Sequence, residues 1–207
     1  MPIEDEGTVT RPSLELESTK SSNVFEPRKA FVALAVAGAI RGRVLEIGCG
    51  SGENSLYLAK RGSEVWGIDM VRTAVKHAQN RANEYGLDAN FVFASALELE
   101  KLGQTFDTVI DSGMFQVFGE RDRQRFAAGL KEVLNIGGRF HVLCFAEQDA
   151  KSAEPCNIRM REIQACFTEG WRILKMEPSL YEDPEHDCTQ AWLATIERLP
   201  DDDGTIS

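Results

Sequence analysis

The chain has 207 residues, of which 43% are hydrophobic and 27% are charged, and its formal net charge is −10. These proportions are typical of one soluble globular domain with a substantial core. The acidic balance, without any basic stripe, argues against a nucleic-acid partner, because contacts to phosphates supply most of the affinity in such complexes. The longest apolar stretch, residues 30–40, is too short to cross a bilayer, so we expect no membrane span.

The cysteines and the first residues of the chain predict the cellular compartment of the protein. Its five cysteines contain no C-x-x-C pair, which favours reduced thiols over a disulfide framework or a zinc site. The first residues are acidic, which argues against a secretory signal, so we expect a cytoplasmic protein. Residues 1–22 lack a hydrophobic period and are interpreted as a flexible leader, and residues 200–207 as an acidic tail. One domain then spans residues 23–199.

A helix is predicted to begin near Pro27, since proline is favoured in the first turn of a helix. Its apolar residues lie roughly along one face, and Gly42 is a plausible stop. We interpret this helix as a cover over one edge of a sheet. An alternative is that Phe25 and Pro27 form part of a lid.

The pattern that organises the chain is Arg-Val-Leu-Glu-Ile-Gly-Cys-Gly-Ser-Gly at residues 43–52. Its short apolar run predicts a strand that is buried on both faces. The glycines at 48, 50 and 52 allow a sharp turn and let a ligand approach the bare main chain. A helical pattern begins at Glu53. Strand, glycine turn and helix together predict the first crossover of a nucleotide-type binding fold.

The next predicted strand, residues 64–69, ends in Asp69, whose carboxylate can accept hydrogen bonds from ribose hydroxyls. The dinucleotide fingerprint needs a third glycine where this chain has Glu53, and an acid at that point would repel a pyrophosphate. S-adenosylmethionine (SAM) has a ribose, no phosphate and a positive sulfonium. Glu46 and Glu53 therefore favour SAM over a dinucleotide.

The rest of the chain alternates between helical and extended patterns. We predict helices at 71–85, 121–135 and 160–170, and strands at 90–94, 106–111, 139–145, 171–176 and 190–198, with a turn at 137–138 and an acidic loop at 178–189. This order predicts a doubly wound, Rossmann-like α/β fold with an antiparallel hairpin at one edge. His77 is expected to be solvated and His141 to be packed within its strand. We expect no metal site around His186.

Four segments carry a family resemblance: residues 44–53, 67–69, 106–115 and 134–139. In this order they resemble a class I SAM-dependent methyltransferase over residues 24–198. The resemblance implies a seven-stranded sheet, mostly parallel with an antiparallel last strand, and SAM as the cofactor. Asp-Ser-Gly-Met-Phe-Gln-Val-Phe at 111–118, followed by Leu-Cys-Phe at 143–145, is similar to the small-molecule branch that contains thiol, thiopurine, halide and tellurite methyltransferases. Members of that branch often have histidine where this chain has Gln116.

The resemblance also implies roles for individual residues. It assigns cofactor binding to Glu46, Gly48, Cys49, Gly50, Gly52, Asp69, Met70, Ser95, Ala96, Asp111 and Ser112. It assigns the substrate pocket to Met114, Phe115, Gln116, Phe118, Phe145 and Glu147, with Asp111 and Gln116 as the catalytic residues. Phe115 and Phe118 have an alternative interpretation as core residues. A nucleophilic role for Cys49 is not favoured.

Methyl transfer from a sulfonium has a neutral leaving group, so that most of the rate can come from positioning the reactants. A thiol or a halide ion needs little help from a general base, whereas a phenol would benefit from one. We therefore expect a small soft nucleophile as the substrate. The alternatives are a phenolic, protein or nucleic-acid acceptor, or a protein that binds SAM without turnover.

Overall fold

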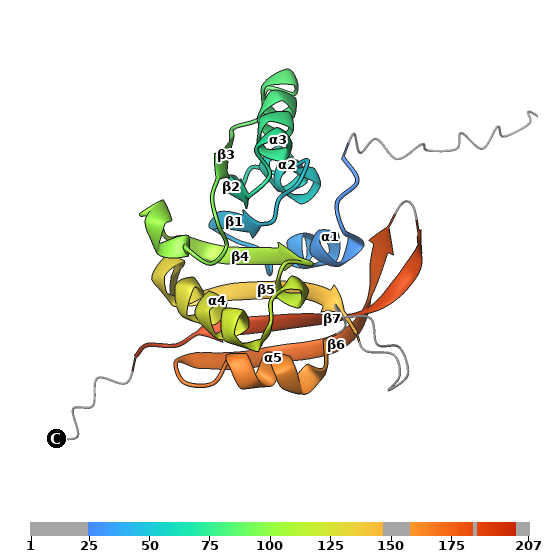
Figure 1. The fold of residues 1–207 in the computed structure, drawn as a ribbon. Coiled ribbons are helices and arrows are strands. Elements are labelled where there is room, and N and C mark those ends of the chain that lie inside the picture. Colours follow the sequence, from blue (N-terminus) through green and yellow to red (C-terminus); the bar gives the residue numbers. More distant parts are fainter. Residues whose placement is uncertain (1–24, 147–157, 184–185, 202–207) are drawn as a thin grey trace, which may run out of the picture.

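The computed structural model describes residues 25–146, 158–183 and 186–201. The predicted leader, most of the predicted acidic tail and Glu147 lie outside these residues, and the side chains around His186 are not described either. Within the described chain, the strands form one seven-stranded sheet in the order β3-β2-β1-β4-β5-β7-β6 (Figure 1).

Neighbouring strands are parallel over most of this sheet. The parallel strands are β1 (Arg43–Ile47), β2 (Glu64–Asp69), β3 (Ala89–Phe93), β4 (Phe106–Ser112) and β5 (Leu134–Phe145). The last strand, β7 (His186–Arg198), is antiparallel to both of its neighbours, β5 and β6 (Trp171–Asp183). The predicted fold, a doubly wound sheet with an antiparallel last strand, is confirmed.

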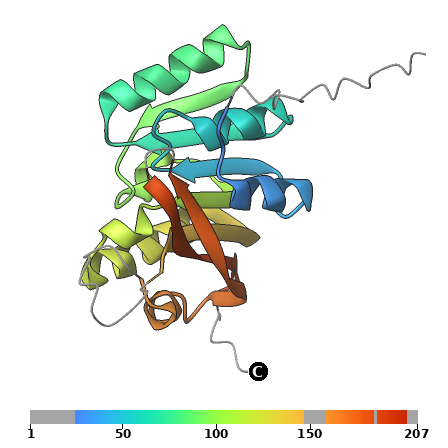
Figure 2. The same ribbon diagram turned by 90° about the vertical axis from the view of Figure 1, so that its right-hand side faces the viewer.

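Helices cover both faces of the sheet (Figure 1, Figure 2). The helices α1 (Lys29–Val36), α2 (Glu53–Lys60) and α3 (Arg72–Glu84) share one buried cluster on one face. The helices α4 (Glu120–Val133) and α5 (Met160–Cys166) share the other cluster, together with the 3₁₀ turns η1 (Leu99–Leu102) and η2 (Phe115–Val117). Each helix therefore buries its apolar side against the sheet, as its periodicity predicted.

The cluster under α4 is rich in aromatic rings. Phe126 lies at its centre, with ring centroids 5.4 Å from Phe118, 5.8 Å from Phe140 and 6.2 Å from Phe115. Aromatic pairs at these spacings add stability beyond the area that they bury. This cluster packs against one face of β4 and β5 and so positions the carboxyl ends of these strands.

The predicted loop at 178–189 is wrong, because β6 continues to Asp183 and β7 begins at His186. Pro178 suggested a break, since proline cannot donate to a strand ladder. However, β6 is the edge strand of the sheet, and its pairing with β7 continues through Pro178 opposite Trp192. An edge strand tolerates proline when its nitrogen faces away from the partner. The hairpin extends beyond the end of β5, where Phe145 pairs with Ala191 (Figure 1).

Other boundaries also differ from the predictions; for example, the helix predicted at 160–170 ends at Cys166. The first helix is shorter than expected and ends at Val36, with Ala37 as its C-cap. The predicted turn at 137–138 lies within β5, where the pairing with β4 shifts from Phe106–Leu134 to Thr108–Arg139. Residues 135–138 therefore form a wide irregularity in the ladder instead of a separate turn.

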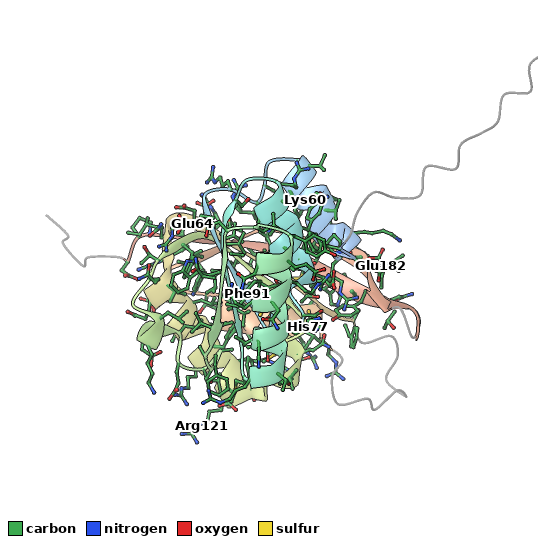
Figure 3. All side chains as sticks on the ribbon, turned by 90° about the horizontal axis from the view of Figure 1, so that it is seen from above. Lys60, Glu64, His77, Phe91, Arg121 and Glu182 are labelled. Carbon is green, nitrogen blue, oxygen red and sulfur yellow. The ribbon has the colours of Figure 1, made fainter. Side chains whose placement is uncertain are left out.

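The two described histidines behave as predicted. His77 is exposed on α3 (Figure 3). His141 is fully buried, with its Nδ1 2.9 Å from Thr195 Oγ1, and burial lowers its pKa to about 4. No helix in the described part of the chain is both long and apolar enough to cross a membrane.

Candidate active site

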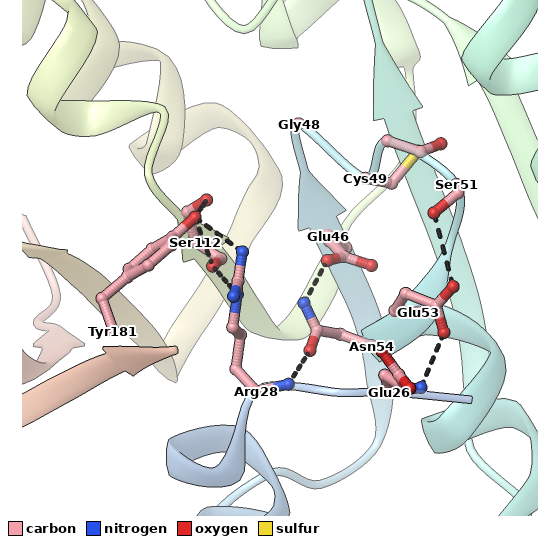
Figure 4. A pocket seen from close by; sticks show the side chains of 11 residues that line it. Glu26, Arg28, Glu46, Gly48, Cys49, Ser51, Glu53, Asn54, Ser112 and Tyr181 are labelled. Carbon is pink, nitrogen blue, oxygen red and sulfur yellow. Dashed lines mark hydrogen bonds between the residues drawn. The ribbon is translucent and has the colours of Figure 1, made fainter. Parts of the chain in front are cut away.

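Two hollows lie at the carboxyl ends of the parallel strands, and they meet at Gly48. The larger has a volume of about 380 Å³, and its walls include the glycine turn, the beginning of α2, Ser112 of β4 and Tyr181 of β6 (Figure 4). The smaller, of about 170 Å³, is lined by Gly48, Ile68, Asp69, Met70, Val71, Ala94, Ala96 and Met114. Ligands of open α/β sheets bind at this end of the strands.

Two glycines of the turn, Gly48 and Gly52, have close neighbours at the position where a side chain would begin. A Cβ atom on Gly48 would lie 2.4 Å from Met114 Cγ, and one on Gly52 would lie 3.1 Å from Ala78 Cβ. Both residues also have positive φ angles, +68° and +83°, which favour glycine. The turn therefore presents bare main chain to both hollows.

Glu46 is buried behind this turn and lines the larger hollow. Its Oε1 accepts a hydrogen bond from Asn54 Nδ2 at 2.7 Å, and its Oε2 accepts one from the Ser55 N–H at 2.9 Å and one from Ser55 Oγ at 2.5 Å. Burial raises the pKa of this carboxyl to about 7. The side chain therefore joins β1 to the first turn of α2 and holds a charge that is easily neutralised.

Asp69 lies at the end of β2 and lines the smaller hollow. Its Oδ2 accepts a hydrogen bond from the Gly50 N–H at 3.0 Å, and its Oδ1 accepts one from the Val71 N–H at 2.8 Å. Asp69 thus braces the glycine turn while its carboxylate remains at the rim of the hollow. Glu46 and Asp69 therefore line two different hollows, which adjoin at Gly48.

The entry segment, residues 25–29, crosses the larger hollow and leads into α1. The Glu26 N–H donates to Glu53 Oε2 at 2.8 Å, and the Arg28 N–H donates to Asn54 Oδ1 at 2.8 Å (Figure 4). Glu53 is also paired with Arg81 of α3. The charge of Glu53 is therefore used to hold the entry segment, rather than being left free to face a ligand.

Arg28 and Tyr181 form one wall of the larger hollow, and the sequence analysis identified neither of them. The Arg28 guanidinium lies 4.0 Å above the Tyr181 ring centroid, and its Nη2 donates to Tyr181 Oη at 3.0 Å. Its Nε donates to Ser112 Oγ at 3.3 Å (Figure 4). No local pattern marks Arg28, and Tyr181 lay within the stretch interpreted as a loop.

The structure places the two residues predicted to be catalytic outside both hollows. Asp111 is fully buried, and its oxygens accept the N–H groups of Met114 at 2.7 Å and Phe115 at 2.8 Å. Burial raises the pKa of Asp111 to about 7. Gln116 is also buried, and its Oε1 accepts the Phe145 N–H at 2.7 Å. Asp111 therefore supports the turn after β4 instead of reaching into a hollow.

The predicted aromatic wall is only partly formed. Phe115 is fully buried in the cluster around Phe126, and Phe118 packs against the same ring, so the core interpretation of both residues holds. Phe145 meets Tyr181 edge to face, with centroids 4.5 Å apart, and Met114 lines the smaller hollow.

Four of the remaining predicted cofactor residues line one of the two hollows, whereas Gly52 and Ser95 line neither of them. Cys49 and Gly50 line the larger one, whereas Met70 and Ala96 line the smaller one. Cys49 is buried, and burial raises the pKa of its thiol, which makes it a poor nucleophile. Ser95 Oγ accepts the Leu97 N–H at 3.2 Å and so stabilises the turn after β3.

Comparison with known proteins identifies the family. Residues 44–138 match the family model described as "Methyltransferase domain". The chain is 30% identical over 162 residues to the 2-heptyl-1-hydroxyquinolin-4(1H)-one methyltransferase of Mycobacteroides abscessus, an alignment that covers 76% of this chain and 70% of the relative. The chain belongs to the class I SAM-dependent methyltransferases. SAM is therefore the cofactor of this methyltransferase.

Solved structures agree with this assignment. A structure titled "Conversion of a Disulfide Bond into a Thioacetal Group during Echinomycin Biosynthesis" superposes with a TM-score of 0.77 and 31% identity, covering 84% of this methyltransferase and 82% of that chain. The magnesium protoporphyrin IX methyltransferase of Synechocystis PCC 6803 with bound SAM has the same fold, with a TM-score of 0.61 and 22% identity over 82% of this chain and 76% of that chain.

Proposed function

We propose that the methyltransferase binds SAM across the two hollows and transfers its methyl group to a small soft nucleophile. The observation that carries the cofactor part is the mixture of charges in the larger hollow, which includes Glu46 and Arg28. The amino-acid end of SAM has both an ammonium group and a carboxylate. A hollow with a buried carboxylate on one side and a guanidinium on the other is complementary to such a zwitterion.

In this proposal the adenosine half lies in the smaller hollow and the amino-acid half in the larger one. Asp69 accepts hydrogen bonds from the ribose hydroxyls, and Met70 and Ala96 pack against the base. Arg28 pairs with the carboxylate through N–H groups that its bonds to Ser112 and Tyr181 leave available. Gly48, Cys49 and Gly50 pass beside the ribose and the chain that leads to the sulfur.

Bound SAM supplies an activated methyl group, so the protein has to align the acceptor and exclude water. Among the described residues near the hollows, the carboxylates of Glu46 and Asp111 each accept hydrogen bonds at both oxygens. Both carboxylates are therefore engaged by the protein itself, and the proposal assigns neither of them the role of a general base. An acceptor that arrives already nucleophilic, such as a thiolate, a thiopurine or a halide ion, therefore fits this site better than an alcohol.

A hydroxyl group on a heteroaromatic ring is the second candidate acceptor. The relative from Mycobacteroides abscessus is named for a 1-hydroxyquinolin-4(1H)-one. A hydroxyl of this kind is acidic enough to ionise without a strong base, so the same argument about proton transfer admits it.

The proposal is tested by incubating the purified protein with SAM and a panel of acceptors. The panel contains thiophenol, a thiopurine, iodide, a 1-hydroxyquinolin-4-one and tRNA, and each product is identified by the mass gain of one CH₂ group. We expect methylation of the small acceptors and none of tRNA. Methylation of tRNA alone, or no methylation of any acceptor by a protein that binds SAM in calorimetry, would refute the proposal.

A further inference from the structure

Asn54 lies in the first turn of α2 and lines the larger hollow between its two charged groups (Figure 4). Its side chain is buried, with only 6% of its surface exposed. Its Oδ1 accepts the Arg28 N–H at 2.8 Å, and its Nδ2 donates to Glu46 Oε1 at 2.7 Å. One amide group therefore contacts both the buried carboxylate and the segment that carries the guanidinium.

The orientation of the Asn54 amide is determined by its partners. The Arg28 N–H can only donate, so the atom of Asn54 next to it has to be the oxygen. The nitrogen is consequently the atom directed at Glu46. A flipped amide would place a donor against the Arg28 N–H and an acceptor against the Glu46 carboxylate. The observed orientation is the one that satisfies both partners.

The donors around Glu46 favour its ionised form. Asn54 Nδ2 points at Oε1, and the N–H of Ser55 points at Oε2. Both nitrogens can only donate, and a donor stabilises a carboxylate more than a neutral carboxyl group. These bonds lower the pKa of Glu46 and so oppose the rise that burial causes. Without the Asn54 donor, Glu46 would hold its proton to higher pH.

The charges near Glu46 make this donor important. Among the described residues, Glu53 of α2 and Asp111 of β4 carry like charges that disfavour the ionisation of Glu46. The other titratable groups that line the hollow are Glu26, Arg28, Cys49 and Tyr181. Of these, Arg28 has the opposite charge, and the Cys49 thiol is neutral because burial raises its pKa. The Asn54 donor therefore offsets the acidic neighbours of Glu46.

The second hydrogen bond of the amide acts on Arg28. This residue is the N-cap of α1, and its guanidinium lies 4.0 Å above the Tyr181 ring centroid. Asn54 holds the main chain of Arg28 on the α2 side of the hollow, and Tyr181 holds its side chain on the β6 side. The position of the guanidinium relative to the Glu46 carboxylate is therefore set through Asn54.

From these contacts we infer that Asn54 is a positioning residue for the amino-acid end of SAM. It fixes the separation between the Glu46 carboxylate and the Arg28 guanidinium, and it favours the ionised form of Glu46 that an ammonium group needs. The inference rests on the proposed function, in which these two groups bind the zwitterion. Asn54 itself takes no part in the chemical step.

The first test is the pH dependence of SAM affinity in Asn54→Asp, measured by calorimetry between pH 6 and pH 9. The variant keeps an oxygen for the Arg28 N–H but replaces the donor at Glu46 by an acceptor. Two adjacent carboxyl groups hold a proton to higher pH than one alone. We expect the midpoint of the pH dependence to rise by about one unit, which weakens SAM about fivefold at pH 7 and restores its affinity by pH 9.

Asn54→Leu removes both hydrogen bonds at a similar side-chain size. We expect the same upward shift of the midpoint, together with a loss of at least about tenfold that persists at pH 9, because the Arg28 N–H has also lost its partner. S-Adenosylhomocysteine has the same zwitterion without the sulfonium charge and should show the same losses as SAM. 5′-Methylthioadenosine lacks the amino-acid end and should bind to both variants as to the wild type.

Matched variants on α3 separate these effects from a general loss of structure. Asn83 is exposed, and Asn83→Asp and Asn83→Leu make the same two changes away from the hollows. They should leave all three affinities unchanged. Unfolding midpoints show whether each variant is folded, and Asn54→Asp carries the test if Asn54→Leu is not.

Three results would overturn the inference. They are a folded Asn54→Asp variant with the pH profile of the wild type, a loss of 5′-methylthioadenosine as large as that of SAM, or an unchanged affinity for S-adenosylhomocysteine. Failure of the proposed function has a different signature, because it is seen in the wild type. In that case SAM binds no more tightly than 5′-methylthioadenosine, or no acceptor in the panel is methylated.

Discussion

Glu46 combines burial with a position beside the proposed cationic ligand. Its folded-state pKa of about 7 lies above the ordinary value of 4.5. The folded protein therefore holds a proton that the unfolded chain has lost, and this group lowers the free energy of unfolding as the pH rises from 4.5 to about 7. A bound ammonium or sulfonium would offset that cost by favouring the ionised carboxylate.

From this linkage we predict that the affinity for SAM increases by up to about tenfold between pH 6 and pH 8. Calorimetry in two buffers of different ionisation enthalpy should show that binding releases a proton. In Glu46→Gln, whose amide can still bond to Asn54 or Ser55, the pH dependence should be lost. If the variant keeps the full dependence, Glu46 is not the titrating group and Asp111, whose pKa is also about 7, becomes the candidate.

Asp69 is predicted to bind the ribose and also braces the glycine turn through the Gly50 N–H. We expect Asp69→Ala to weaken SAM binding by about 1–3 kcal/mol, because a set of hydrogen bonds is left unmade. Isothermal titration calorimetry measures this change. Asp88→Ala, which removes an exposed carboxylate between α3 and β3, is the control. Unchanged affinity in a folded Asp69 variant would remove this residue from the site.

At the level of elements, the entry segment connects the two halves of the sheet. It is held by Glu53 and Asn54 of α2 on one side and by Ser112 of β4 and Tyr181 of β6 on the other. Because Arg28 is the N-cap of α1 and also lines the larger hollow, the placement of this segment and the proposed binding of a carboxylate are coupled.

This coupling predicts a selective effect of Arg28→Gln. The variant should lose about 1–3 kcal/mol of affinity for SAM, because it lacks a charged partner for the carboxylate. Its affinity for 5′-methylthioadenosine, which has no amino-acid moiety, should not change. Both affinities come from calorimetry, with Arg121→Gln on the exposed side of α4 as the control. Equal losses for the two ligands would mean that Arg28 acts on the adenosine half or on the fold.

For the molecule as a whole, the aromatic cluster under α4 packs against one face of β4 and β5. Phe126 is fully buried at its centre. We predict that Phe126→Ala lowers the free energy of unfolding by about 3–5 kcal/mol, since it leaves a cavity that the neighbouring rings cannot fill. Urea denaturation measures the loss. Phe93→Ala, at a side chain that is 44% exposed, should cost much less. Equal costs would show that burial in this cluster does not determine stability.

Local signals in the sequence were sufficient for the fold and for the glycine turn at which the two hollows meet. The glycine turn, Glu46 before it and Asp69 at the next strand end are short patterns whose geometry follows from the backbone, and β2 occupies the residues predicted for it. The alternation of strands and helices determined the doubly wound sheet in the same way. These features depend on neighbours in the chain, so that one sequence is enough to find them.

Only the tertiary structure decided which residues far apart in the chain line the larger hollow. Arg28 and Tyr181 are 153 positions apart and meet because the β6–β7 hairpin extends past β5 toward α1. Within β4, neighbouring side chains point to opposite sides, so Ser112 lines the hollow whereas Asp111 faces the buried turn. A sequence pattern indicates that such residues lie at a strand end. Which of them faces the ligand depends on the register and packing of elements far apart in the chain, and local propensity carries no information about these.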